Sequence, residues 1–304
     1  MNLKLENLAY QQQAIDSIVG VFDGQERNTF DNATTEGIRF NYLRLTPEHL
    51  ADNVKVVAAR NGIAAKVLQP SGEPDFCIEM ETGTGKTLVY LKTILELHKH
   101  YGFTKFIILV PSVAIKEGVL TTFETFAPQL EERYGFRPAC FEYDSTRLNK
   151  VTEFIESQHP QIMVMTLQSF NADDRILNQA QREDLFSSIP FIEAIGRTRP
   201  IIVMDEPQEG MDTDNAVARI ARLNPLCTLR YSATHKVVRN LLYRLTPFDS
   251  YRQGLVKKIE VLSVAEKKDE ASLKIEVAEV RTFTNGREPQ VKLLAWRYSA
   301  IKNA

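Results

Sequence analysis

The chain has 304 residues, of which 43% are hydrophobic and 25% are charged, and its net charge is −2. This is enough for one large domain and a small one, and the charge balance is not that of a strongly basic nucleic-acid-coating protein, although net charge hides any local basic groove. The polar N-terminus lacks a signal-peptide core and the longest apolar runs, such as 106–110, are too short to cross a bilayer, so we expect a cytoplasmic protein without a membrane partner.

Short apolar runs alternate with segments of helical periodicity. We expect strands at 76–80, 105–110, 161–167, 200–206 and 226–234, and helices at 9–22, from Pro47 onward, 87–102, 112–126 and 214–223. Thr46 is placed to cap the second helix and Gly102 to end the third. The strands are continuous apolar runs, which is typical of parallel sheets covered by helices on both faces. The sequence therefore predicts an open, mostly parallel α/β sheet, and it leaves the strand order open.

The character of the chain changes near Gly254. The stretch 255–304 contains β-branched and alternating runs, interrupted by a charged segment at 266–270 and by Asn285-Gly286, a strong hairpin signal. We therefore expect two parts: a nucleotide-binding domain over 1–254 and a small β-rich segment over 255–304.

A glycine-rich stretch, METGTGKT (80–87), lies between an expected strand and an expected helix, which is the context of a phosphate-binding loop. Gly83 and Gly85 allow the backbone to turn its N–H groups toward phosphate oxygens, and Thr82 and Thr84 complete the loop. Lys86 brings a positive charge to the phosphates of ATP. The strict P-loop pattern, G-x-x-x-x-G-K-[ST], has glycine where this chain has Met80. The prediction of a phosphate-binding loop therefore rests on the TGTGKT core.

Two acidic residues, Asp205 and Glu206, follow the apolar run at 201–204. They are expected at the carboxyl end of a strand, where ligands bind in open α/β sheets. Thr87 and Asp205 are the expected ligands of Mg²⁺, directly or through water, and Glu206 is expected to orient or deprotonate the attacking water.

The order of TGTGKT, DEPQ (205–208) and SAT (232–234) resembles motifs I, II and III of superfamily 2 helicases and translocases. The DEPQ form is similar to the Res subunit of type III restriction enzymes. Other segments fit the same family: AYQQQAI with Gln11 resembles the Q motif, 109–119 motif Ia, 165–171 the Ib region, and 254–261 the segment leaving the first motor domain.

The resemblance implies a RecA-like, ATP-driven motor domain acting on double-stranded DNA. Gln11 would contact adenine, and Gln208 would join Lys86, Asp205 and Glu206 in the catalytic set. The residues implied to face DNA or to couple it to ATP are Ser112, Lys116, Thr166, Gln168, Ser232 and Thr234. Small hydroxyls and amides suit contacts to the phosphate backbone. For Ser112 a purely structural role as a helix cap is an equal alternative.

The family pairs two motor domains, and the second supplies arginine fingers to the nucleotide. After residue 262 we find neither a second set of such motifs nor a nuclease signature. The resemblance thus implies an N-terminal motor domain alone, which in the full complex works with a modification methyltransferase subunit. An arginine finger is worth roughly 10³–10⁵ in turnover, so we expect the isolated chain to hydrolyse ATP poorly.

Two other interpretations stay open at this stage. The chain would be a P-loop NTPase of another class if DNA had no influence on nucleotide binding. It would be a degenerate motor domain that only binds a partner if it failed to bind nucleotide with its P-loop intact. The recognition sequence, the oligomeric state, the direction of movement and the role of 263–304 do not follow from the sequence.

Overall fold

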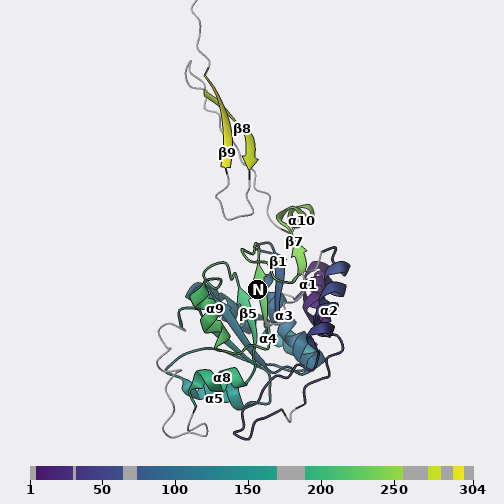
Figure 1. The fold of residues 1–304 in the computed structure, drawn as a ribbon, viewed down its shortest axis with the longest axis vertical. Helices are drawn as coiled ribbons and strands as arrows, with labels where there is room; N and C mark the ends of the chain where they lie inside the picture. Colours follow the sequence, from purple (N-terminus) through teal and green to yellow (C-terminus); the bar gives the residue numbers. More distant parts are fainter. Residues whose placement is uncertain are drawn as a thin grey trace, which may run out of the picture. The chain divides into compact units, whose positions relative to one another are not determined.

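Seven parallel strands form the sheet of the first of two compact units, Met1–Lys257 (Figure 1). The computed structural model describes residues 5–29, 32–63, 74–169, 189–255, 273–281 and 290–297. In spatial order the strands are β3 (Ala139–Glu142), β4 (Gln161–Thr166), β2 (Lys105–Val110), β5 (Ile201–Asp205), β6 (Cys227–Ser232), β1 (Asp75–Met80) and β7 (Leu241–Leu245). All the pairings between them are parallel. The predicted open, parallel α/β sheet is confirmed.

Helices cover both faces of this sheet (Figure 1). The helices in the described ranges are α1 (Ala9–Val19, continued by a 3₁₀ turn at Gly20–Phe22), α2 (Pro47–Arg60), α3 (Lys86–Tyr101), α4 (Val113–Tyr134), α5 (Leu148–Glu156), α8 (Phe191–Arg197), α9 (Asp214–Ala221) and α10 (Pro247–Arg252), the last of which follows β7. None of the helices in the described ranges is long and apolar enough to cross a membrane.

The strands of the sheet send their side chains alternately to two buried faces, which explains why their sequences are continuous apolar runs. In β2, Phe106 and Ile108 pack into one core with residues of α1 and α3, whereas Ile107 and Leu109 pack into a second core with residues of α5 and α8. Successive side chains of a strand point to opposite faces, so a strand buried on both faces needs an apolar residue at every position.

The second face becomes polar where β6 and β1 lie side by side. Phe76, Ile78, Leu229 and Tyr231 belong to the first core, so the residues between them point to the other face. We call these the polar seam: Asp75, Cys77 and Glu79 of β1, and Thr228, Arg230 and Ser232 of β6. All six are at least nine-tenths buried. Buried polar groups require partners. Asp75, Arg230 and Ser232 find theirs in the loops that follow β5 and β6, and Glu79 pairs with Arg244 of β7.

Several helix ends form as the sequence predicts. The Thr46 hydroxyl accepts a hydrogen bond from the His49 N–H (3.3 Å), with Pro47 at the first helical position of α2. Gly102 ends α3 in the left-handed conformation, at φ +69°. The predicted end of α4 near residue 126 is wrong, because that helix continues through Pro128 to Tyr134. Its last turns bury Leu130 against Leu95 of α3, and this tertiary packing overrides the local signal.

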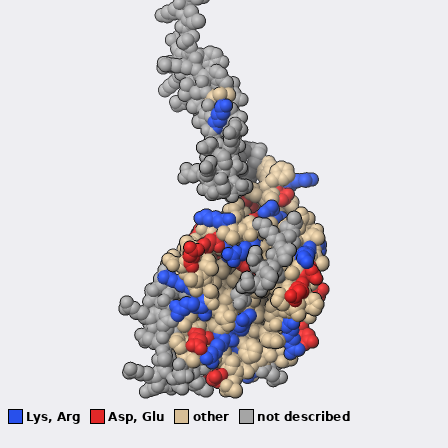
Figure 2. Space-filling model, in the orientation of Figure 1, with Lys and Arg blue, Asp and Glu red and all other residues tan. Residues whose placement is uncertain are grey.

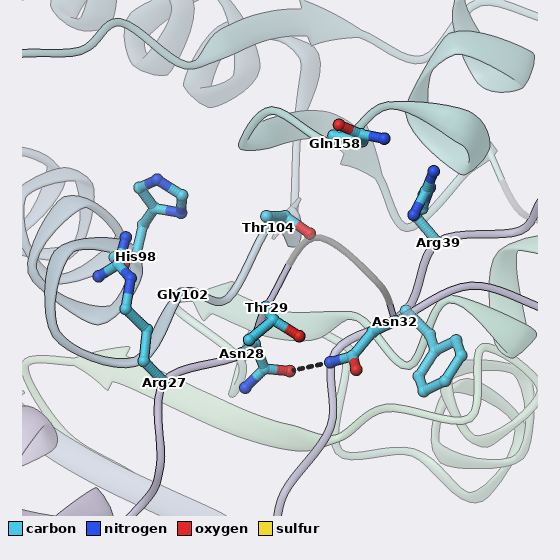
Figure 3. Close-up of a pocket in the computed structure, with 10 residues that line it drawn as sticks. Arg27, Asn28, Thr29, Asn32, Arg39, His98, Gly102, Thr104 and Gln158 are labelled. Atoms are coloured by element: carbon cyan, nitrogen blue, oxygen red, sulfur yellow. Dashed lines mark hydrogen bonds between the residues drawn. The ribbon is translucent and has the colours of Figure 1, made fainter.

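The stretch 24–45 crosses the amino ends of the strands and is held there by asparagines. The Asn41 amide donates to the carbonyls of Lys105 (2.9 Å) and Arg199 (3.1 Å), and its oxygen accepts from the Thr104 N–H (2.8 Å). Figure 3 shows the small pocket beside it, of about 20 Å³, which has room for about one water molecule. Asn32 donates to Asn28 across this pocket (3.0 Å).

The second compact unit, Lys258–Ala304, contains an antiparallel pair of strands, β8 (Leu273–Arg281) and β9 (Gln290–Arg297). The predicted hairpin turn at Asn285-Gly286 lies outside the described residues.

Two glycines that end helices allow a matched test of the packing. Gly102 and Gly135 end α3 and α4 at φ +69° and +77°, but a Cβ on Gly102 would lie 2.5 Å from the Asn28 carbonyl oxygen, whereas one on Gly135 would meet nothing within 4 Å. We expect Gly135→Ala to lower the free energy of unfolding by about 1–2 kcal/mol, the cost of a left-handed non-glycine residue. Gly102→Ala adds a clash with backbone and should cost a further 1–3 kcal/mol or so.

Urea unfolding of the two variants and of the unsubstituted chain measures both values. Equal losses for the two substitutions would contradict the close approach of the 24–45 stretch to α3.

Candidate functional site

The P-loop follows β1 and leads into α3, as predicted. Gly83 and Gly85 have φ values of +82° and +86°, which a side chain would strain, and Gly85 is the N-cap of α3. The loop borders an open pocket of about 610 Å³ at the carboxyl edge of the sheet. Its lining includes the predicted residues Thr82, Gly83, Gly85, Lys86, Thr87, Asp205, Glu206 and Gln208, together with Ile115, Glu209 and Ala233.

The Lys86 ammonium is held inside the site. It lies 2.7 Å from the Glu206 Oε1 atom and donates to the Met80 carbonyl at 3.2 Å. The two charged side chains are 10% and 17% exposed, so solvent screens their attraction only weakly. The lysine of the P-loop and the second acid of DEPQ therefore form one ion pair.

Asp205 ends β5 and is buried beneath this pair. The Tyr90 hydroxyl, one helical turn after Lys86, donates to its Oδ2 atom at 3.3 Å. Burial and the neighbouring charge of Glu206 raise the pKa of Asp205 to about 6, against the lowering effect of Lys86. Tyr90 was not predicted from the sequence, although its i+4 spacing from Lys86 places both on one side of α3.

Glu206 connects the P-loop to the SAT segment. Its other oxygen, Oε2, accepts hydrogen bonds from Gln208 Nε2 (2.7 Å) and from the Ser232 hydroxyl (2.8 Å). The backbone of Glu206 is left-handed, at φ +48°, which is unusual for a residue with a side chain. Burial works to raise the pKa of Glu206, but hydrogen bonds from Lys86, Gln208 and Ser232 outweigh it and hold that pKa below its usual range.

Ser232 and Thr234 form a tight turn at the end of β6. The Ser232 hydroxyl lies 2.8 Å from the carbonyl oxygen of Thr234 and from Oε1 of Gln208, and it accepts from the Thr234 N–H at 3.0 Å. The Ser232 hydroxyl therefore contacts both the DEPQ segment and the turn that follows β6.

The N-terminal part of α1 packs onto the P-loop. Gln11 Nε2 and the Tyr10 hydroxyl both donate to the Thr84 carbonyl, at 3.1 and 2.9 Å. The Thr84 hydroxyl turns inward to the Glu81 carbonyl (2.6 Å). The Gln11 Oε1 atom is buried and has no hydrogen-bond partner among the residues that the structure describes. A Cβ on Gly85 would lie 2.6 Å from Gln11 Nε2, so the Gln11 amide would have to move aside, and the left-handed φ of Gly85 is what favours glycine here.

Eight of the predicted residues are not part of the pocket lining: Gln11, Thr84, Ser232 and Thr234, described above, and the four that remain. Ser112 caps α4 by accepting from the Ile115 N–H (3.3 Å), Lys116 pairs with Glu142 (2.6 Å), Gln168 donates to the Pro111 carbonyl (3.1 Å), and Thr166 bonds the Ser169 hydroxyl (2.8 Å). The Gln168 bond brings the motif Ia and Ib segments together. On the face drawn in Figure 2, basic and acidic side chains are interspersed.

Comparison with known proteins gives a consistent match. The family described as type III restriction enzyme, res subunit, matches residues 4–237. The chain is 30% identical over 274 residues to the EcoPI Res subunit of Escherichia phage P1 and 28% identical over 274 residues to the EcoP15I Res subunit of Escherichia coli. Each alignment covers 84% of this chain and 28% of the relative, so the chain spans less than a third of their length.

Among solved structures, the DUF1998 helicase MrfA bound to DNA is similar over 72% of this chain and 30% of its own, with 15% identity and a TM-score of 0.41. The family match includes the P-loop, the DEPQ acids and the SAT segment, which the structure joins in one network. The chain belongs to the family of type III restriction enzyme Res subunits.

Proposed function

We propose that this chain is the ATP-binding motor domain of a type III restriction enzyme, which hydrolyses ATP to drive movement along double-stranded DNA in the complete enzyme. One observation carries the proposal: the Glu206 carboxylate joins the P-loop lysine to the SAT segment through Lys86 and Ser232. A site that only bound nucleotide would not need this connection. A motor needs it, because events at the phosphates must reach another surface.

The residues that line the pocket, together with Gln11 behind the loop, fit ATP·Mg²⁺. Gln11 Oε1 is a buried acceptor without a partner among the described residues, which suits the exocyclic amine of adenine. Two left-handed glycines shape the phosphate loop, and Lys86 supplies its charge. Thr87 and Asp205 offer a hydroxyl and a carboxylate, which are ligand types that Mg²⁺ prefers.

The chemistry assigned to the protein follows from the Lys86–Glu206 pair. When bound, ATP with Mg²⁺ supplies the phosphoryl group and the metal charge that stabilises its transfer. Lys86 would then divide its hydrogen bonds between Glu206 and a phosphate oxygen. Glu206, with less of the pairing that lowers its pKa, would be a stronger base toward water. Gln208 and Ser232 keep its carboxylate oriented while this happens.

The proposal also covers the rate of ATP hydrolysis and the partners of the chain. Residues from another domain would complete the phosphate site, so the isolated chain should hydrolyse ATP slowly. The matched relatives are named restriction-modification enzyme Res subunits, and we propose that a modification methyltransferase subunit is the partner in the complex. Ser112, Lys116, Thr166 and Gln168 are the residues proposed to face DNA. Lys116 would exchange its pairing with Glu142 for a phosphate.

Two variants should affect nucleotide binding and ATP hydrolysis differently. Lys86→Ala removes a charge-assisted contact and should weaken binding of a fluorescent ATP analogue with Mg²⁺ by roughly 10- to 100-fold. Glu206→Gln should bind at least as tightly, because Lys86 is released, yet lose about 10²–10⁴ in turnover. Lys55→Ala, which removes an exposed lysine of α2, is the control and should change neither quantity.

Failure of the unsubstituted chain to bind at millimolar nucleotide would refute the proposal. Nucleotide binding that duplex DNA left unchanged would instead favour a P-loop NTPase of another class.

The metal site should depend on pH through Asp205. Its pKa of about 6 means that the carboxyl is protonated below that pH and must release a proton to bind Mg²⁺. We expect the Mg²⁺-dependent gain in nucleotide affinity to be fully present near pH 7.5 and to fall up to about tenfold per unit below about pH 6. The phosphates of ATP titrate in the same range, so the measured quantity is the difference between the chain and Asp205→Asn. Equal pH profiles for the two would show that Asp205 does not bind the metal.

A further inference from the structure

Arg230 forms a buried three-way ion bridge within the polar seam. Its guanidinium pairs with Asp212 and lies 3.5 Å from Asp75 Oδ2. The side chains are 4%, 14% and 10% exposed, in the order Arg230, Asp212 and Asp75. Asp75 begins the strand that leads to the P-loop, Asp212 follows the DEPQ acids, and Arg230 precedes SAT by two residues. The Arg230 side chain thus connects three segments that lead into or follow the P-loop, DEPQ and SAT motifs.

The segment from Glu206 to Asp212, here called the acid loop, is attached to β6 at both ends. The Glu206 N–H donates to the Tyr231 carbonyl at 2.9 Å, and Asp212 pairs with Arg230. Inside the loop, the Met211 N–H donates to the Pro207 carbonyl (2.9 Å). The two anchor points on β6 are therefore consecutive residues, and they hold the acid loop between them.

The strained backbone of Glu206 needs such anchors. A side-chain-bearing residue at φ +48° persists only where its surroundings enforce it. The first anchor acts on Glu206 itself, and Arg230 acts on the far end of its loop. We propose that Arg230 is a positioning residue for hydrolysis: by holding Asp212 it keeps the Glu206 carboxylate on Lys86 and Ser232. This inference rests on the proposed role of Glu206 as the base.

The chain provides a matched control in Arg239. Its Nη1 lies 3.3 Å from the same Asp75 Oδ2 atom, and its side chain is 53% exposed. It comes from the stretch after SAT, and the contacts described for it are with Asp75 and Cys77. Removing Arg239 therefore takes one guanidinium from Asp75 and leaves the acid loop attached.

The test uses the full chain and the variants Asp212→Asn, Arg230→Gln and Arg239→Gln. Hydrogen–deuterium exchange is followed in the acid loop and, as an internal reference, in α3. In Asp212→Asn and Arg230→Gln we expect exchange of the acid loop to accelerate by about tenfold or more, with α3 unchanged. Single-turnover ATP hydrolysis should fall by about tenfold or more, while nucleotide affinity stays within about threefold. Arg239→Gln should leave hydrolysis and exchange of the acid loop at their original values.

Arg230→Gln leaves Asp212 without its cation and Asp75 with Arg239 as its remaining partner, and it can fail to fold. Asp212→Asn keeps an oxygen that accepts from Arg230, and it decides the question in that case. Three results in these variants would each overturn the inference. Exchange in the acid loop could stay unchanged, exchange in α3 could rise by the same factor, or hydrolysis could equal that of Arg239→Gln. If the unsubstituted chain neither binds nor hydrolyses ATP, the proposed function fails, and the exchange measurement alone still decides whether Arg230 anchors the loop.

Discussion

One carboxylate group, that of Glu206, holds together three segments that are far apart in the sequence. A buried carboxylate is stable only with partners, and here Lys86, Gln208 and Ser232 supply them. The order of the sheet makes this possible, because β5 and β6 are neighbours and β1 lies next to β6. Parallel strands bring their carboxyl ends to one edge, so three local motifs become one site. The interaction that stabilises this edge is also the one that we assign to catalysis.

Local signals explain what could be predicted from the sequence. The continuous apolar runs gave five strands because burial on both faces leaves no polar position in most of them. Gly102 and Thr46 act within one turn of a helix, so their roles depend on few distant residues. The P-loop was found for the same reason, since its glycines, its lysine and the flanking elements are contiguous.

Features decided by distant partners did not follow from the sequence. β7 is a short run that pairs with β1, far away in the sequence, and not with β6, which precedes it in the chain. Helix α4 extends past Pro128 because Leu130 packs on α3. Arg230 is an unexpected charge inside a buried strand, and nothing near it in the sequence indicates Asp75 as its partner. Lys116 is similar, since Glu142 lies 26 residues further along the chain.

The Gln11 amide lies directly beside Gly85, and this proximity links helix α1 to the phosphate loop. The Gln11 amide occupies the space that a side chain at position 85 would fill, and it also bonds the Thr84 carbonyl. Helix α1 and the phosphate loop are therefore in direct contact through one side chain. The Gln11 Oε1 atom has no hydrogen-bond partner among the described residues, so a ligand that bound it would act on the Thr84 backbone through the same amide group. Under the proposed role of Gln11 at the base, the position of the base and the conformation of the loop would depend on each other.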